Sequence, residues 1–363
     1  MAILNNDILK VGIIGCGLIG NKRAAVINED PSSILCSTSD VNVITAGAVL
    51  QQYGHHSGQV YGDWRVMLSE TKPNVVIVAT PNKYLHEIAL EALRRGIHVL
   101  CEKPLGRNPR ESEQLVKVAR EYGVILKTGF NHRHHPAIFK AHDLVSKGAI
   151  GQVYYARCIY GHGGRPGYEK EWRASKDICG GGELLDQGVH VVDLFRWFLG
   201  DFEEAVGYTQ TYYWPMEVED NAFAVFRTSG RQTATMHTSW TQWKNRFTFE
   251  IFGEAGYSIV EGLGGSYGVE KLIIGKRPRN PGTSVNSGGK NQYLGGAPEE
   301  DTLIFDGPDV SWEMEWKEFT AAIREKREPL GNGRDGLEAN RMLAAVYLSA
   351  KKKHPVKISE VVS

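Results

Sequence analysis

The sequence predicts two domains, an α/β domain with a doubly wound parallel sheet and an α+β domain with a mostly antiparallel sheet. Two patterns predict this division. Short apolar runs alternate with helical stretches over residues 1–130, whereas closely spaced strands joined by turns dominate residues 131–363. The length of 363 residues also fits two domains, at roughly 150 residues for each.

The first domain alternates apolar strands with amphipathic helices. Gly96 and Gly123 follow two of the helices, where glycine easily takes the left-handed conformation that ends a helix. Because strands and helices alternate, the strands are expected to run parallel beneath helices on both faces. Strands are expected at residues 10–14, 34–36, 75–80, 98–101 and 124–126, and helices at 85–95 and 111–121.

The second domain is expected to be rich in strands. Residues 276–309 contain many Gly, Pro, Asn and Ser residues and predict a long surface excursion. Asp335 and Glu338 form a candidate capping box for the last helix, which is expected to pack back on the first domain. Strands are predicted at 153–160, 204–212, 222–227, 233–240, 247–252 and 257–261, and helices at 182–199, 312–325 and 336–350.

The composition argues against several classes of protein. Lys and Arg total 42, as do Asp and Glu, so the chain lacks the basic excess of nucleic-acid-binding proteins. No apolar run approaches the roughly 18 residues of a membrane span, and residues 1–10 lack the apolar core of a signal peptide. The five cysteines are widely spaced without a CxxC pair, which favours free thiols. We therefore expect a cytoplasmic protein that binds neither nucleic acid nor membrane.

A glycine-rich turn near the N-terminus predicts a dinucleotide site. Gly15, Gly17 and Gly20 fit GxGxxG between the first strand and a helix that includes Leu18 and Ile19. The first glycine permits the tight turn, the second lets the backbone approach a pyrophosphate, and the third lets helix and strand pack closely. The helix N-terminus then offers free N–H groups to the phosphates. We expect these five residues to bind the cofactor.

Residues after the next strands indicate which dinucleotide binds. Asp40 lies 20 residues after Gly20, where a carboxylate accepts hydrogen bonds from ribose hydroxyls and repels a 2′-phosphate. NAD is therefore favoured over NADP. Thr80 and Asn82 follow the third strand at the same sheet edge, where they either contact the ribose or serve as ordinary turn residues.

Two further clusters carry candidate chemical groups. Glu102 and Lys103 follow another strand at that edge, so Lys103 faces either the nicotinamide or solvent. Asp186, His190 and Asp193 are spaced i, i+4 and i+7 and are expected to share one stripe of the 182–199 helix. These side chains either line the wall of a site, or they are a histidine buried in the core and an aspartate that caps a helix.

These clusters, in this order, resemble the Gfo/Idh/MocA family of glucose–fructose oxidoreductases and inositol dehydrogenases. The resemblance runs from GxGxxG through Glu-Lys-Pro and the Gly-Gly-x-x-x-Asp-x-Gly-x-His helix to the last helix. It implies a Rossmann domain followed by an α+β domain whose large open sheet mediates homodimers or homotetramers. It also implies that Lys103 is the catalytic lysine and that Asp186 and His190 are the family's Asp/His pair.

The resemblance further implies an NAD(P)-dependent dehydrogenase that acts on a sugar or polyol. Trp172 and Arg173 match a pair beside the active site and cofactor, and Asn131 matches a position that lines the substrate site. Arg165 and Tyr168 precede the catalytic helix. They either bind a phosphate and a sugar face, which favours a nucleotide-linked sugar, or belong to an ordinary surface loop.

The chemistry of alcohol oxidation assigns roles to these residues. Oxidising a secondary ring hydroxyl removes a hydride, which NAD accepts, and a proton, which a base must take. His190 is suited to be that base, with Asp186 orienting its ring and Lys103 stabilising the alkoxide charge. Two alternatives are a redox-assisted glycosidase or lyase with tightly bound NAD, and a non-catalytic regulator that binds NAD and sugar.

Histidines are also concentrated in two short runs. His132, His134 and His135 form one run, and His55 and His56 form the other. Neither run has a cysteine partner or the HExxH spacing of a zinc site, so no metal is expected.

Overall fold

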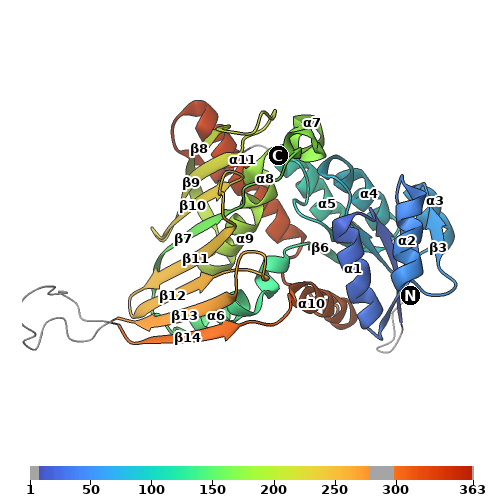
Figure 1. Ribbon diagram of the computed structural model, residues 1–363, viewed down its shortest axis with the longest axis horizontal. Coiled ribbons are helices and arrows are strands. Elements are labelled where there is room, and N and C mark those ends of the chain that lie inside the picture. The colour runs from blue at the N-terminus through green and yellow to red at the C-terminus, as the bar shows by residue number, and fades with distance from the viewer. Residues whose placement is uncertain (1–7, 278–297, 362–363) are drawn as a thin grey trace, which may run out of the picture.

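The computed structural model describes residues 8–277 and 298–361, which form two sheets with helices packed around them (Figure 1). The first sheet has six parallel strands in the order β3-β2-β1-β4-β5-β6, so the expected doubly wound parallel sheet is confirmed. Its strands are β1 (Leu9–Ile14), β2 (Ser33–Ser39), β3 (Gln59–Tyr61), β4 (Val75–Val78), β5 (His98–Cys101) and β6 (Leu126–Thr128). Its helices are α1 (Leu18–Glu29), α2 (Val43–Tyr53), α3 (Trp64–Thr71), α4 (Asn82–Arg94) and α5 (Pro109–Tyr122).

The centre of this sheet determines where a ligand can bind. β1 and β4 are adjacent, and all the residues of β4 are buried, as expected for a parallel strand covered on both faces. The strand order reverses between β1 and β4, and sheets of this kind bind ligands at the carboxyl ends of the strands beside such a reversal. The glycine turn after β1 and Thr80 after β4 both lie at that position.

Two features of the first sheet differ from the sequence-based expectation. β6 begins at Leu126 instead of Val124, because Gly123 ends α5 in the left-handed conformation and the Val124 N–H still bonds to the Ala119 carbonyl of that helix. The three-residue edge strand β3 was not predicted, since it is short and its side chains are mostly exposed.

The second sheet has nine strands in the order β14-β13-β12-β11-β7-β10-β9-β8-β15. Most neighbours are antiparallel, as predicted, but β7 and β10 run parallel. β14 lies within the predicted excursion at 276–309, because its apolar Leu303 pairs with Leu272 of β13; residues 278–297 lie outside the described residues. The strands are β7 (Val153–Gly161), β8 (Phe202–Gln210), β9 (Asn221–Thr228), β10 (Thr233–Ser239), β11 (Arg246–Gly253), β12 (Gly256–Glu261), β13 (Glu270–Lys276), β14 (Glu300–Phe305) and β15 (Val356–Lys357).

One face of the second sheet is covered by α6 (Pro136–Ser146), α9 (Gly188–Leu199) and α11 (Gly333–Lys352). Their apolar side chains join those of the strands in one core, where Phe195 of α9 contacts Phe226 and Phe249 edge-on or tilted. The predicted helix over 182–199 is two helices, a short α8 (Glu183–Asp186) and α9, with a break at Gln187. This break separates the side chains that were expected to share one stripe.

Two C-terminal helices connect the two halves of the molecule. α10 (Ser311–Glu325) packs against α1 and against the 3-10 turn η1 (Asn131–His134), and Figure 1 shows it between the two sheets. α11 begins before the expected position, because Asn332 and Asp335 form its capping box in place of Asp335 and Glu338. Asn340 of α11 donates to the Gly106 carbonyl at 2.7 Å, which ties this helix to the segment before α5.

Two simpler predictions can be compared with the structure directly. All five cysteines are free thiols, as predicted. Within residues 8–277 and 298–361, no helix combines the length and apolar character needed to cross a membrane.

Candidate active site

The turn after β1 has the geometry of a dinucleotide cradle. Gly15 has a φ of +91°, and a Cβ there would lie 2.6 Å from the backbone that follows β4. A Cβ on Gly20 would lie 2.0 Å from the Gly15 carbonyl oxygen, whereas one on Gly17 would meet nothing within 4 Å. Packing therefore requires Gly15 and Gly20, while Gly17 leaves open space before Leu18 and Ile19 in the first turn of α1.

Asp40 lies beside this turn at the end of β2. Its carboxylate accepts the backbone N–H of Cys16 at 2.8 Å and that of Asn42 at 2.9 Å. The next side chain, Val41, is 97% exposed and uncharged, so it offers no cation to a 2′-phosphate. Across the turn, the buried hydroxyl of Thr80 has no hydrogen-bond partner. The open space and the unpartnered hydroxyl fit NAD.

Asn82 bonds to a distant part of the chain, and its expected contact with the ribose stays a prediction. It is buried at the start of α4, and its Nδ2 donates to the Cys179 carbonyl at 2.8 Å. Cys179 ends the short helix α7 (Lys176–Cys179). Asn82 therefore ties α4 to the segment that precedes α8.

Lys103 and Asp186 form the centre of the candidate site. The Lys103 Nζ donates to the Asp186 carboxylate and to the Asp186 carbonyl, each at 2.7 Å. Arg173 Nε lies 3.3 Å from the other carboxylate oxygen. Burial favours a raised pKa for Asp186, but the charges of Lys103 and Arg173 outweigh it and hold that pKa below its ordinary value. The site thus contains an ionised aspartate that fixes the lysine ammonium.

His190 contacts a different set of residues from the one expected. Its ring stacks on His132, with ring centroids 3.7 Å apart and planes 15° apart. Its Nδ1 is buried without a hydrogen-bond partner, so Asp186 does not orient the ring in this structure. Burial and the nearby charge of Lys103 hold the pKa of His190 well below its ordinary value, so the imidazole is neutral.

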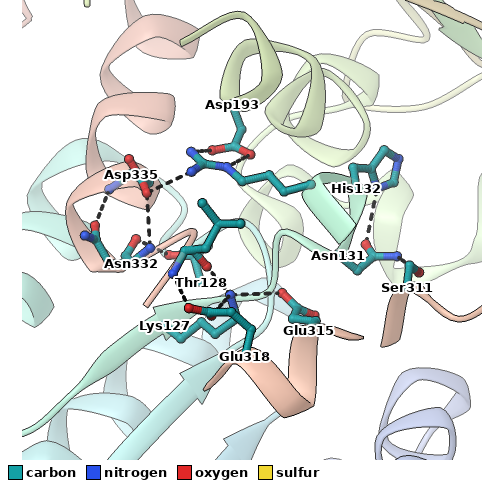
Figure 2. Close-up of polar contacts among 12 residues, drawn as sticks. Lys127, Thr128, Asn131, His132, Asp193, Ser311, Glu315, Glu318, Asn332 and Asp335 are labelled. Atoms are coloured by element: carbon teal, nitrogen blue, oxygen red, sulfur yellow. Dashed lines mark hydrogen bonds and ion pairs between the residues drawn. The ribbon is translucent and has the colours of Figure 1, made fainter. Parts of the chain in front are cut away.

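Asp193, the third member of the expected stripe, also faces away from His190. Its carboxylate accepts two hydrogen bonds from the Arg133 guanidinium, at 2.5 and 2.8 Å. Figure 2 shows Asp193 and Asp335 near each other, and Asp335 is the second carboxylate paired with Arg133. The break at Gln187 is the physical reason, because it rotates α9 relative to α8.

Two other predicted site residues belong to buried networks. The Asn131 amide donates to the Ser311 hydroxyl and its oxygen faces the His132 ring, as Figure 2 shows. Glu102 accepts hydrogen bonds from Arg23 at 2.6 and 2.8 Å. The structure therefore places both residues beside Lys103 and His190 as supports, and a direct contact with substrate or cofactor stays a prediction.

The segment before α8 contains the remaining predicted residues. The guanidinium of Arg173 lies 4.5 Å from the centre of the Trp172 ring, so these two residues form one unit beside Asp186. Arg165 forms an ion pair with Glu171 at 2.7 Å. Tyr168 is only 2% exposed and packs in an aromatic cluster, so it is a core residue and not a platform for a sugar face.

Several residues at the site were not predicted from the sequence. The run that contains His132 was considered for a metal or for contacts to sugar hydroxyls or phosphate, but its place beside His190 was not predicted. His132 stacks on His190, and its Nε2 lies 3.1 Å from the Tyr160 hydroxyl. Glu183 and Gln187 occur inside the recognised motif, but their chemistry became visible only from their burial and missing partners. Among the described residues, no group of three or more His, Cys, Asp or Glu side chains is arranged to hold a metal ion.

Two stretches of the chain match described protein families. Residues 9–130 match the oxidoreductase family with an NAD-binding Rossmann fold, and residues 138–259 match the GFO/IDH/MocA C-terminal domain. The chain belongs to the Gfo/Idh/MocA family. It is therefore an NAD(P)-dependent oxidoreductase, and the resemblance inferred from its motifs is confirmed.

Individual relatives support this membership. The chain is 27% identical over 287 residues to levoglucosan dehydrogenase of Pseudarthrobacter phenanthrenivorans, covering 69% of this chain and 73% of that protein. It is 30% identical over 273 residues to 1,5-anhydro-D-fructose reductase of Ensifer adhaerens, covering 75% of each. A solved structure of levoglucosan dehydrogenase in complex with NADH and L-sorbose has the same fold, with a TM-score of 0.85, 23% identity and coverage of 98% of this chain and all of that one.

Proposed function

We propose that this protein oxidises a secondary ring hydroxyl of a sugar or polyol to a ketone with NAD, or catalyses the reverse reduction. One observation carries the proposal. A lysine ammonium fixed by an ionised aspartate lies close enough to a neutral histidine to lower its pKa, at the edge of the sheet where the cofactor cradle opens. A proton acceptor beside a fixed cation is what alcohol oxidation requires.

The residues have the following proposed roles. NAD, when bound, supplies the acceptor for the hydride. His190 takes the hydroxyl proton, for which its neutral imidazole is prepared. Lys103 donates a hydrogen bond to the same substrate oxygen and stabilises its developing negative charge. Asp186 positions Lys103, with which it shares a hydrogen bond of 2.7 Å, and this replaces its expected role at His190.

We favour a sugar or polyol without a nucleotide as the substrate, although another relative, 30% identical over 204 residues, is named as a reductase of a dTDP-linked sugar. The named activities of the two relatives concern levoglucosan and 1,5-anhydro-D-fructose, both of which are unphosphorylated anhydro sugars. The nucleotide-linked substrate was expected from Arg165 and Arg173, but each of these is already paired with a carboxylate. A diphosphate would have to break these pairs.

We also propose that the protein forms a homo-oligomer through the open face of its nine-stranded sheet. Tyr155, Phe223 and Val225 are 39 to 40% exposed on that face, and Tyr208 is 70% exposed. Phe223 and Val225 lie on β9 and Tyr208 on the adjacent strand β8, whereas Tyr155 lies on β7, which β10 separates from β9.

A direct assay tests the proposed reaction. The purified protein is mixed with NAD and levoglucosan, methyl glucosides, myo-inositol or nucleotide-linked sugars, and both NADH and product masses are followed. A product two hydrogens lighter than its sugar, formed with an equal amount of NADH, supports the proposal. A cleaved product without net NADH would instead support a redox-assisted glycosidase or lyase.

A further inference from the structure

A carboxyl group lies buried beside the Lys103–Asp186 pair with no partner of its own. Glu183, the first residue of α8, is 0% exposed, and neither of its side-chain oxygens has a hydrogen-bond partner. Other buried polar atoms nearby are also unpartnered, namely Thr238 Oγ1, Trp240 Nε1 and Gln187 Oε1. Buried polar groups in folded proteins almost always have hydrogen-bond partners. Several unpartnered groups in one part of the structure therefore point to a ligand that would pair with them.

The position of Glu183 relates it to the proposed chemistry. α8 packs against β9 and β10, and a Cβ on Gly188 would lie 3.6 Å from the Thr238 hydroxyl. Thr238 is paired across the sheet with Tyr160, whose hydroxyl contacts His132. Glu183 interacts electrostatically with Lys103, Asp186 and Tyr160. Glu183 therefore belongs to a helix that packs on the sheet, and its carboxyl is close enough to Lys103 and Asp186 to interact with their charges.

The charges around Glu183 determine its protonation state. Lys103 is the cation that acts on it, and Lys103 is bound to Asp186. The third carboxyl, Glu219, accepts hydrogen bonds from two backbone N–H groups and a tyrosine hydroxyl. Burial, followed by the charge of Asp186, raises the pKa of Glu183 well above its ordinary value. The charge of Lys103 and the backbone N–H of Ser239 oppose this rise, but that N–H lies outside the geometry of a full hydrogen bond to the carboxyl. Glu183 is therefore a neutral acid.

We propose that Glu183 is a protonated carboxylic acid that donates a hydrogen bond to an oxygen of the bound sugar and so helps to select the substrate. This inference rests on the function proposed above. A neutral carboxylic acid has one O–H to donate, and Glu183 finds no acceptor among the residues that the structure describes. A sugar held at Lys103 brings several hydroxyl and ring oxygens into the neighbourhood. A site built to hydrogen-bond a substrate hydroxyl discriminates against an analogue without it.

Two substitutions test the inference, with methyl β-D-glucopyranoside as the probe. Glu183→Met removes both oxygens at similar length and is expected to raise KM about tenfold with little change in kcat. It is also expected to raise the thermal midpoint of the sugar-free protein, because it removes an unpartnered buried polar group. Glu183→Gln keeps a donor and is expected to restore most of the affinity. If Glu183→Met lowered the thermal midpoint and left KM unchanged, Glu183 would serve the stability of the fold and not substrate binding. That result would overturn the inference.

Monodeoxy derivatives of the same glucoside identify the contacted oxygen. The wild-type protein is expected to discriminate about tenfold against one derivative, and Glu183→Met is expected to lose that discrimination while keeping the others. Equal discrimination by the two proteins against every derivative would overturn the inference.

An infrared measurement separates failure of this inference from failure of the proposed function. The wild-type protein at neutral pH is expected to show the carbonyl band of a protonated carboxylic acid, which Glu183→Gln lacks and which shifts when the glucoside and NADH are added. If none of the tested sugars is oxidised, the proposed function fails. The inference about Glu183 is overturned separately if the band is absent or does not shift.

Discussion

Two buried polar clusters differ in how well their members are paired. The first contains Arg23, Glu102, Lys127, Glu315 and Glu318, whose opposite charges lie 2.6 to 3.8 Å apart. Figure 2 shows Lys127 between Glu315 and Glu318. The second cluster surrounds Glu183, whose two carboxyl oxygens have no ion pair and no partner within hydrogen-bond geometry among the described residues.

The difference separates a structural cluster from a binding cluster. Arg23 comes from α1, Lys127 from β6 and Glu315 from α10, so the paired charges join the first sheet to the C-terminal helices. A buried charge that loses its partner costs several kcal/mol, so such a cluster must be complete. Glu183 keeps its hydrogen-bonding capacity unused, which is expected of a group whose partner is a ligand.

The largest expected effect comes from the lysine of the candidate site. Lys103→Met removes the fixed ammonium and is expected to lower kcat about a thousandfold, because charge on the substrate oxygen is no longer stabilised. Steady-state kinetics measure the loss, and NADH fluorescence serves as the control, since the glycine cradle is unchanged. Retention of more than about a tenth of wild-type turnover would remove Lys103 from the proposed mechanism.

Breaking the paired cluster is expected to damage stability instead of selectivity. Arg23→Met removes the cation bound to Glu102 and leaves Glu315 with Lys127 alone, 3.5 Å away. It is expected to lower the free energy of unfolding by about 3 kcal/mol. Chemical denaturation measures the change. Glu183→Met is the matched variant, and it is expected to raise the free energy of unfolding instead of lowering it. If both variants changed stability in the same direction, the comparison between the clusters would be wrong.

The buried histidines predict how stability depends on pH. Burial, with nearby charges, holds the pKa values of His132, His134 and His190 well below the ordinary value. The unfolded chain therefore binds more protons than the folded protein below about pH 6.5. The contribution of each histidine to the free energy of unfolding is fully present above that pH. It falls by about 1.4 kcal/mol for each pH unit below it. His134→Gln removes one titrating group, so its thermal midpoint should fall less steeply. An unchanged slope would contradict the neutral assignment of His134.

The smallest expected effect on catalysis comes from the open sheet face. Phe223→Glu places a charge in the exposed apolar surface and is expected to shift the protein toward the monomer, with turnover per chain changed less than about twofold. Light scattering after gel filtration measures the mass. Tyr122→Glu on α5 is the control, because Tyr122 is 47% exposed but lies outside the sheet. The oligomer proposal fails if both variants have the same mass as the wild type.

The parts of the fold that were predicted well depend on local patterns. The residues of β5 were predicted without error, and Gly15, Gly17 and Gly20 were placed in the turn where the structure has them. In both cases the signal lies in a few consecutive residues, where apolar runs form buried strands and glycines permit close approach.

One prediction that failed concerns a break in a helix. Asp186 and His190 were expected to act together, because one continuous helix would place them on one face. The break at Gln187 lets Asp186 bind Lys103 and places His190 on His132. Residue spacing does not report such a break, because it is stabilised by contacts with distant strands.

The sequence by itself determined the parallel sheet, the dinucleotide cradle, the preference for NAD and the identity of Lys103 and His190 as candidate chemical groups. These depend on residue type and short spacing, which are local properties. Only the tertiary structure decided that Asp186 holds Lys103, that Arg165 and Asn82 are already bonded, and that Glu183 has no partner. The physical reason is that burial and pairing depend on residues far apart in the chain, so they are defined only once both sheets and the C-terminal helices are packed together.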